Sequence, residues 1–420
     1  MIVDFYIPLI TILCTLLVFR GKRILYNDKF WILLWWGIIL GVYLSSGINW
    51  GNYGLSTDLL LFLSICCFFY FSFRKLGTKC KIREASNKEW IIDNRIVIGG
   101  YVGLGAFIFD WLRLNALGIT KASYNISFIG TVGMLFVPIL LVFGIYSIGD
   151  TLVKRQKISK VGILSLLLYS IPCLLNSGRQ NVLYIIVAII VIWAIETDRY
   201  NIKITISARG KKILFVGMIC LISLVYIIYN ISVKRIDDNY ISTFLNTHNV
   251  PWEIQEEANK LGPFKFLYYN VLSYFGHQIP YLDVMLHEYS GPYLGGMFQF
   301  NIISRRLPSF LELDYRLVWT QVSAIISRFG GMFNASWFSV LGAMIADFSA
   351  IFTPVVLAFL GLLVGIARKK FIQYANLKYD VLYCLICIMM FDTIIISPFY
   401  NFLTYGGLIW WALIFRKKYH

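Results

Sequence analysis

The chain alternates between long apolar blocks and short polar segments. A helix needs about 20 apolar residues to cross the roughly 30 Å of hydrocarbon in a bilayer. About eleven blocks approach or reach that length: Phe5–Phe19, Phe30–Ile48, Leu59–Phe73, Trp90–Trp111, Phe128–Ile148, Val161–Leu175, Asn181–Ile195, Ile213–Ile231, Ala350–Ala367, Val381–Ile396 and Phe402–Phe415. The pattern predicts an all-α integral membrane protein with about 11 transmembrane helices, in a range of 10 to 12.

One long segment breaks this pattern. Residues 232–332 are mostly too polar to span a bilayer, whereas a plain connection between helices needs only a few residues. We therefore divide the chain into N-terminal transmembrane helices (1–231), a long loop (232–332), and a re-entrant segment with C-terminal transmembrane helices (333–420).

Basic residues follow the first block closely, and no small-residue cleavage site is present, so that block is expected to be an anchor rather than a signal peptide.

Basic residues are distributed unevenly between the two predicted sides. The loops after alternate blocks, together with the C-terminal tail, hold 27 of the 38 Lys and Arg residues. By the positive-inside rule these segments are cytoplasmic, which places the long loop outside the cytoplasm. The net charge of +16 is then mostly charge near lipid headgroups, and no nucleic-acid partner is expected.

Common catalytic and nucleotide-binding motifs are missing. The sequence has no GxxxxGK[ST], no GxGxxG at a strand–helix junction, no HExxH and no paired CxxC at zinc spacing. We expect no cofactor and no metal, and any driving force for chemistry has to come from the substrate.

A short polar turn, NSGRQN at residues 176–181, separates two apolar blocks. Arg179 is expected at the start of a helix, where unpaired N–H groups and the helix dipole favour an anion. An Arg fork in that place suits a diphosphate, and the alternative is an interfacial Arg that reaches lipid phosphate.

The second half of the long loop contains four arginines and no lysine: Arg305, Arg306, Arg316 and Arg328. Arg is the residue expected for forked recognition of phosphate. The alternative is ordinary ion pairing with Glu312 and Asp314. Among the loop histidines, His287 is a candidate base, although most loop histidines have a structural role.

The segment 330–365 begins with a short apolar stretch, Phe333–Ala346, that is rich in small residues. Its length suggests a re-entrant helix before a full span. Asp347 is expected at the break. A carboxylate at membrane depth is costly and is therefore a functional candidate, while the alternative is an N-cap of the following helix.

These motifs occur in a distinctive order: SGRQNVL opening a helix, YLGGMF, a loop rich in Arg and Pro, an N-x-S start at Asn334, and ADF before a helix with several glycines. Over roughly residues 176–365 the chain resembles the oligosaccharide repeat-unit polymerases of bacterial surface polysaccharide pathways, the O-antigen polymerases. It departs from the usual DFG at Ser349. The related O-antigen ligases share the Arg-x-x-x-Leu turn of Arg179 and Leu183, but carry a histidine where this chain has Phe333.

The resemblance implies an inverting, C-type membrane glycosyltransferase in the bacterial cytoplasmic (inner) membrane, with its active site facing the periplasm. Its partners would be undecaprenyl-diphosphate-linked oligosaccharides, membrane lipids and a polysaccharide chain-length regulator. The expected product is O-antigen or capsular-type polysaccharide. The expected base is Asp347, then His287 or Glu288, then Asp283; the expected substrate-binding residues are Arg179, Arg305, Arg306, Arg316, Arg328 and Asn334.

Two other functions remain open at the level of sequence. An O-antigen ligase would differ only in its acceptor. A flippase for lipid-linked oligosaccharides would also need Arg for diphosphate, but would be expected to line a central cavity with charged residues and to lack so long an outer loop. Asp392 is the clearest of the few mid-span ionisable residues.

Overall fold

The structure is a computed structural model of the 420-residue chain. It describes residues 21–46, 48, 53–81, 90–116, 128–175, 180–202, 245–246, 250–300, 320, 322, 324, 339–393 and 402–417. The predicted spans Phe5–Phe19 and Ile213–Ile231 lie outside the described residues.

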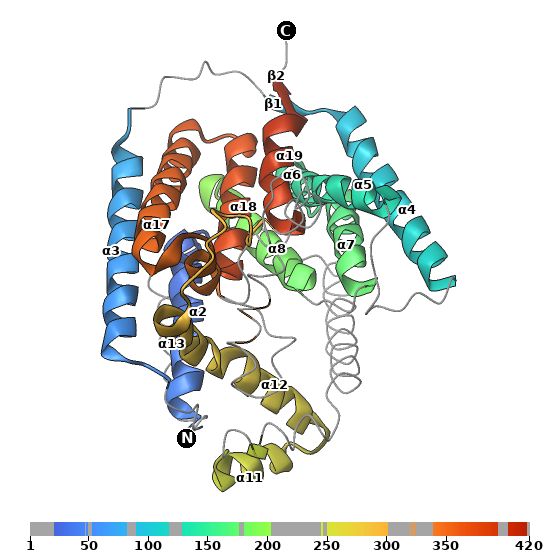
Figure 1. Cartoon of the computed structure of the whole chain (residues 1–420). Helices are drawn as coiled ribbons and strands as arrows, with labels where there is room; N and C mark the ends of the chain where they lie inside the picture. The colour runs from blue at the N-terminus through green and yellow to red at the C-terminus, as the bar shows by residue number, and fades with distance from the viewer. Residues whose placement is uncertain are drawn as a thin grey trace.

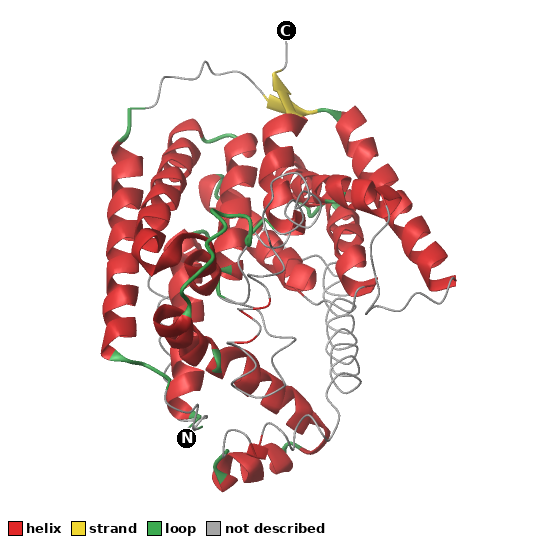
Figure 2. Ribbon diagram, viewed as in Figure 1, coloured by secondary structure: helices red, strands yellow, loops and turns green. Residues whose placement is uncertain are grey.

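The described chain is mostly helical, as Figure 2 shows. Its elements are η1 (Gly21–Ile24), α2 (Asp28–Ser45), α3 (Thr57–Lys79), β1 (Trp90–Ile92), α4 (Asn94–Ala116), α5 (Phe128–Phe136), α6 (Pro138–Arg155), α7 (Lys160–Leu175), α8 (Gln180–Arg199), α11 (Trp252–Lys260), η3 (Gly262–Phe264), α12 (Lys265–Gly276), α13 (Gln278–Glu288), α17 (Val340–Tyr374), α18 (Leu377–Asp392), α19 (Phe402–Ile414) and β2 (Phe415–Lys417).

Within these residues, five helical stretches are long and apolar enough to cross a membrane: Thr57–Lys79, Asn94–Ala116, Phe128–Arg155, Asn181–Arg199 and Val340–Tyr374. Two shorter apolar helices, Lys160–Leu175 and Phe402–Ile414, accompany them. Large apolar side chains are exposed on these helices, among them Phe68, Phe109 and Phe359. An apolar exterior of this kind suits a protein embedded in a membrane.

Two details of the sequence prediction are wrong. The chain is not purely α-helical, because β1 and β2 pair antiparallel, with Ile91 opposite Arg416. The block Trp90–Trp111 is therefore not one helix: its first three residues form β1, and α4 begins only at Asn94. The apolar Trp90–Ile92 triplet fits a helix and a strand equally well, and its pairing with the distant β2 determines the outcome.

The two ends of the helix bundle differ in what they carry (Figure 1). The β1–β2 pair lies at one end, next to the C-terminus, and α11 to α13 from the predicted outer loop lie at the other. We call these the strand end and the loop end. Helix α18 lies inside the bundle and packs against α2, α6, α8, α17 and α19.

Helices α3 and α17 approach each other through glycines. A Cβ atom on Gly365 would lie 2.2 Å from the carbonyl oxygen of Arg74, and one on Gly361 would lie 2.3 Å from that of Tyr70. Gly77 on α3 makes the reciprocal approach, since its Cβ would lie 2.3 Å from the oxygen of Leu362. Small residues at such an interface let two backbones pack closely, which is how helices associate without a hydrophobic driving force.

A buried carboxylate links four helices at the strand end. Both oxygens of Asp28, the first residue of α2, accept hydrogen bonds from Arg74 of α3. One of them also accepts from Arg368 of α17 at 3.0 Å and from the Tyr383 hydroxyl of α18 at 2.6 Å. Asp28 is completely buried. Part of the basic charge that the sequence places near lipid headgroups is thus used inside the bundle, where Arg74 and Arg368 bind Asp28.

Helix α17 contains a break. Ser349 has φ 68° and ψ 164°, which ends one helical segment and starts the next. A short helical segment thus precedes a longer one, while residues 333–338 of the predicted re-entrant helix Phe333–Ala346 lie outside the described residues, so that helix stays a prediction. The break falls two residues after Asp347.

We predict that Gly365→Ala destabilises the protein. The added methyl group has no room against the α3 backbone, and overpacking costs about 1–3 kcal/mol. Thermal melting in detergent should show a lower Tm. Gly105→Ala is the matched control, because nothing lies within 4 Å of a Cβ at Gly105. A Gly365→Ala protein that melts with the wild type would disprove the close packing of α3 on α17.

Candidate functional site

The structure describes only some of the residues expected in the site. Arg179, Arg305, Arg306, Arg316, Arg328 and Asn334 lie outside the described residues, so their predicted roles stay predictions. The four candidate bases, Asp283, His287, Glu288 and Asp347, are described and occupy two separate places.

Asp347 binds the backbone of another segment. Its two carboxylate oxygens accept hydrogen bonds from the N–H groups of Phe298 at 2.8 Å and Gln299 at 3.0 Å. Its own carbonyl oxygen accepts from the N–H of Gly295 at 2.9 Å. Asp347 therefore holds a turn of the outer loop against α17. The alternative that it caps the following helix is wrong, because its acceptors are used by this turn.

Asp283 and Glu288 hold the segment that leads into α3. The Asp283 carboxylate accepts from the Gly54 N–H at 3.0 Å and from the Ser56 hydroxyl. The Tyr53 hydroxyl donates to Glu288. These acids belong to α13 and tie it to residues 53–58 at the loop end of the bundle. Their acceptor atoms are used in packing two segments together.

His287 lies between two oxygen acceptors. Nδ1 is 2.9 Å from the carbonyl oxygen of Asp283, and Nε2 is 3.3 Å from the carboxylate of Asp58. Since both nitrogens face acceptors, the doubly protonated imidazolium fits best. These hydrogen bonds, first the one to Asp283 and then the one to Asp58, raise the pKa of His287 above its usual 6.5. An imidazole kept protonated in this way is a poor general base.

A different group of polar side chains is buried without partners. Asn181 and Tyr184 on α8, Asp392 at the end of α18, and Thr404 and Tyr405 on α19 all have buried side-chain polar atoms that make no hydrogen bond. The hydroxyls of Tyr184 and Thr404 face the Asp392 carboxylate and favour its charge, although no pair of the three meets the distance and angle of a hydrogen bond. Asn181 is three residues before Tyr184 on α8, and Tyr405 follows Thr404 on α19. We call these five residues, of which Tyr184 and Thr404 interact with Asp392, the Asp392 cluster.

Such a cluster is unusual in a folded protein. More than nine in ten buried polar groups are hydrogen-bonded, and a buried group without a partner costs about 1–3 kcal/mol. Asp392 is fully buried, as is Asp28, but Asp28 has three hydrogen-bonded side-chain partners, whereas no side chain in the described part of the chain reaches hydrogen-bond geometry with Asp392. The missing hydrogen bonds indicate a place prepared for a polar ligand or for water.

Several segments meet beside this cluster. The N–H of Val340, at the start of α17, donates to the carbonyl oxygen of Thr393, which follows Asp392. The ring of Phe300, at the end of the turn held by Asp347, meets the Tyr405 ring edge-on at 5.3 Å between centroids. Asp347 thus fixes a turn of the outer loop next to the cluster. This positioning role accounts for the burial of Asp347, and its predicted part in proton transfer stays a prediction.

Chain connectivity joins the predicted arginines to the same place. Arg179 directly precedes Gln180, the first residue of α8. Arg305, Arg306, Arg316 and Arg328 lie in the sequence between Phe300 and Ser339, a stretch of which the structure describes only residues 320, 322 and 324. We therefore take the Asp392 cluster as the described part of the candidate site.

Among the residues that the structure describes, no group of three or more His, Cys, Asp or Glu side chains is arranged to hold a metal ion.

The sequence marks two members of the cluster. Asp392 is visible as an acid within an apolar block, although it is not among the expected bases, and Asn181 ends the polar turn NSGRQN. Tyr184 and Thr404 carry no signal of their own, because each is an ordinary residue near the start of its helix. Listing the polar residues in the first turns of the predicted helices would have included Tyr184 and Thr404. Such a list would not have shown that the two residues lie close together in the fold.

We predict that Asp392→Asn folds at least as stably as the wild type. The substitution removes a buried carboxylate without breaking any hydrogen bond, so its Tm in detergent should be unchanged or higher. Asp28→Asn is the matched comparison. Asp28→Asn removes the carboxylate that forms an ion pair with Arg74, and breaking a buried ion pair lowers the free energy of unfolding by about 3–5 kcal/mol. A large loss of Tm in Asp392→Asn would show that Asp392 has a structural partner.

We predict that His287 stabilises the fold only when it is protonated. Because its folded-state pKa is raised, the stabilisation is complete below the unfolded value of about 6.5 and is lost as the pH rises through the folded-state value. The Tm difference between wild type and His287→Gln should be positive at about pH 5.5 and vanish by about pH 9. A difference that grows with pH would contradict the assignment.

The Asp392 cluster, the turn held by Asp347 and the start of α17 form a site at the loop end of α8, α18 and α19. Comparison with protein-family models, with curated proteins and with solved structures finds no match for this chain.

Proposed function

We propose that the protein polymerises lipid-linked oligosaccharide repeat units at the outer face of the bacterial cytoplasmic membrane. In the reaction, the bond between the anomeric carbon of the growing chain and the oxygen of its undecaprenyl diphosphate breaks. A hydroxyl oxygen of the incoming unit bonds to that carbon with inversion. The hydroxyl proton passes to a base, and undecaprenyl diphosphate leaves with the electron pair of the broken bond.

The observation that carries the proposal is the unpaired carboxylate of Asp392 beside buried hydroxyl and amide groups. A sugar offers both donors and acceptors, and the cluster offers the matching set: an acceptor on Asp392, hydroxyls on Tyr184 and Thr404, and an amide on Asn181. A hydroxyl that hydrogen-bonds to Asp392 can lose its proton there as it attacks. Asp392 is thus our choice of base in place of Asp347, whose oxygens are already occupied.

The leaving diphosphate requires cations. Arg179 adjoins the cluster in sequence, and Arg305, Arg306, Arg316 and Arg328 lie on the segment whose two ends flank it. Guanidinium groups bind phosphate through two parallel hydrogen bonds and stabilise charge that develops on the leaving group. The Asp392 carboxylate would thus act on the acceptor hydroxyl, and the arginines would act on the diphosphate of the donor.

The arrangement of the bundle supports an outward-facing site. The strand end carries β2 and the basic residues at and beside the ends of α6, α7, α17 and α18 that meet there, and the positive-inside rule assigns such residues to the cytoplasm. They are Lys154, Arg155, Lys157, Lys160, Arg368, Lys369, Lys370 and Lys378. The loop end, with α11 to α13, is the opposite end (Figure 1). The Asp392 cluster lies where α8 and α19 begin and α18 ends, away from the strand end. We also propose that the protein acts together with a polysaccharide chain-length regulator.

The test is a reconstituted reaction. Purified protein in lipid vesicles, incubated with undecaprenyl-diphosphate-linked repeat units alone, should produce a ladder of longer lipid-linked chains. We predict that Asp392→Asn lowers the rate by about 10²–10⁴ because the general base is lost. Arg179→Lys, which keeps the charge and loses the fork, should also lower it.

Gly105→Ala is the control for purification and for insertion into the vesicles, since a Cβ atom at Gly105 would have no neighbour within 4 Å. A folded wild type that makes no ladder contradicts the polymerase assignment. Transfer to a different lipid acceptor would indicate a ligase, and movement of intact lipid-linked units across the bilayer would indicate a flippase. A normal ladder from Asp392→Asn would remove Asp392 as the base while leaving the function itself in place.

A further inference from the structure

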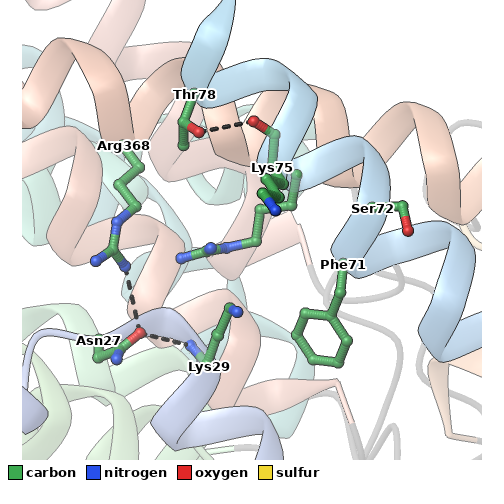
Figure 3. Close-up of a pocket in the computed structure, with 8 residues that line it drawn as sticks. Asn27, Lys29, Phe71, Ser72, Lys75, Thr78 and Arg368 are labelled. Carbon is green, nitrogen blue, oxygen red and sulfur yellow. Dashed lines mark hydrogen bonds between the residues drawn. The ribbon is translucent and has the colours of Figure 1, made fainter.

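A second polar site lies at the strand end of the bundle, far along α17 from the Asp392 cluster. A cavity of about 590 Å³ opens between the start of α2, the last turns of α3 and the second half of α17. Its lining residues are Asn27, Lys29, Phe71, Ser72, Arg74, Lys75, Thr78 and Arg368. Figure 3 shows Lys29, Lys75 and Arg368 reaching into the same space from three different helices.

The lining is strongly cationic. It contains four basic residues and no acidic one. Asp28 lies behind the wall, fully buried, and its oxygens are occupied by Arg74, Arg368 and Tyr383. Neither Lys29 nor Lys75 forms an ion pair with any carboxylate in the described part of the chain. Within the residues that the structure describes, the two ammonium groups therefore face the cavity without a carboxylate at ion-pair distance.

The cations also repel one another. Burial first, and then the charges of Arg74, Arg368 and Lys75, disfavour the ammonium of Lys29. Asp28 and the face of the Phe71 ring, whose centroid lies 5.0 Å from the ammonium, offset part of this. A cluster of like charges within one cavity is costly unless an anion occupies it. The Asp28 network fixes the side chains of Arg74 and Arg368 in place. Binding a ligand would therefore cost less side-chain entropy, because these two arginines are already ordered.

Phosphate is the anion that best fits this lining. It accepts several hydrogen bonds at once from ammonium and guanidinium groups and from hydroxyls such as that of Ser72. The cavity also lies towards the strand end of α3, a helix long and apolar enough to cross a membrane, so a position near lipid headgroups is consistent with its place in the sequence. We propose that this cavity binds a phosphate ester, presented either by an anionic lipid headgroup or by a small soluble phosphate. The proposal does not depend on the function of the Asp392 cluster.

The experiment compares two double variants of the full chain in neutral detergent. Lys29→Gln with Lys75→Gln removes the two unpaired charges and leaves the Asp28 network intact. Lys157→Gln with Lys160→Gln is the matched control, because both residues are exposed on the α6–α7 connection and lie outside the cavity. Binding is measured by native mass spectrometry and by the rise in Tm, with phosphatidylglycerol, phosphatidylcholine and inorganic phosphate as separate probes.

We expect phosphatidylglycerol or inorganic phosphate to raise the Tm of the wild type and of the control, and phosphatidylcholine to do so less. The Lys29/Lys75 variant should bind the effective probe about tenfold more weakly or worse. A response to the lipid alone identifies a headgroup site, and a response to inorganic phosphate identifies a site for a soluble ligand. The proposal fails if neither probe binds, or if both double variants lose affinity equally. Should the Lys29/Lys75 variant misfold, Ser72→Ala with Lys75→Gln provides the same comparison.

Discussion

One carboxylate, Asp28, determines how the strand end of this bundle is put together. It receives hydrogen bonds from α3, α17 and α18 while belonging to α2, so four helices meet at one buried group. Removing an ion from water is expensive, and it is tolerated only where the remaining hydrogen-bond sites are filled. That condition is met here, since Arg74 binds both oxygens and Arg368 and Tyr383 complete the set. The glycine contacts between α3 and α17 bring Arg74 and Arg368 within reach of the same acid.

The contrast with Asp392 is the main argument for a functional site. Both acids are fully buried in the same bundle, but only Asp28 has its acceptors filled by the protein. Glu196 on α8 is also buried with both oxygens outside hydrogen-bond geometry, but Asp380 and Arg199 lie beside it, whereas the neighbours of Asp392 are the uncharged Tyr184 and Thr404. Unmet hydrogen bonds are tolerated where they serve binding or catalysis, at some expense in stability. The position of the cluster, beside a turn that Asp347 holds in place, fits a site whose shape is fixed in advance.

Hydropathy predicted much of the helical framework, because apolar blocks of membrane length have few alternatives. Blocks such as Val161–Leu175 and Phe402–Phe415 correspond to α7 and α19 within a few residues. Side-chain partnerships were not predictable in the same way. The Asp28–Arg74 pair and the Trp90–Lys417 strand pairing join residues far apart in sequence, and no local pattern marks them. The Asp392 cluster was missed for the same reason, since its members come from three helices.

The central claim is that the Asp392 cluster receives a polar part of a lipid-linked oligosaccharide. Its most direct test is a cryo-electron microscopy structure of the protein in a lipid nanodisc with a bound, non-reacting lipid-linked repeat unit. The account predicts sugar hydroxyls hydrogen-bonded to Asp392 and Tyr184, with the diphosphate on arginines at the loop end. A ligand bound elsewhere, with the cluster closed on its own side chains, would contradict it.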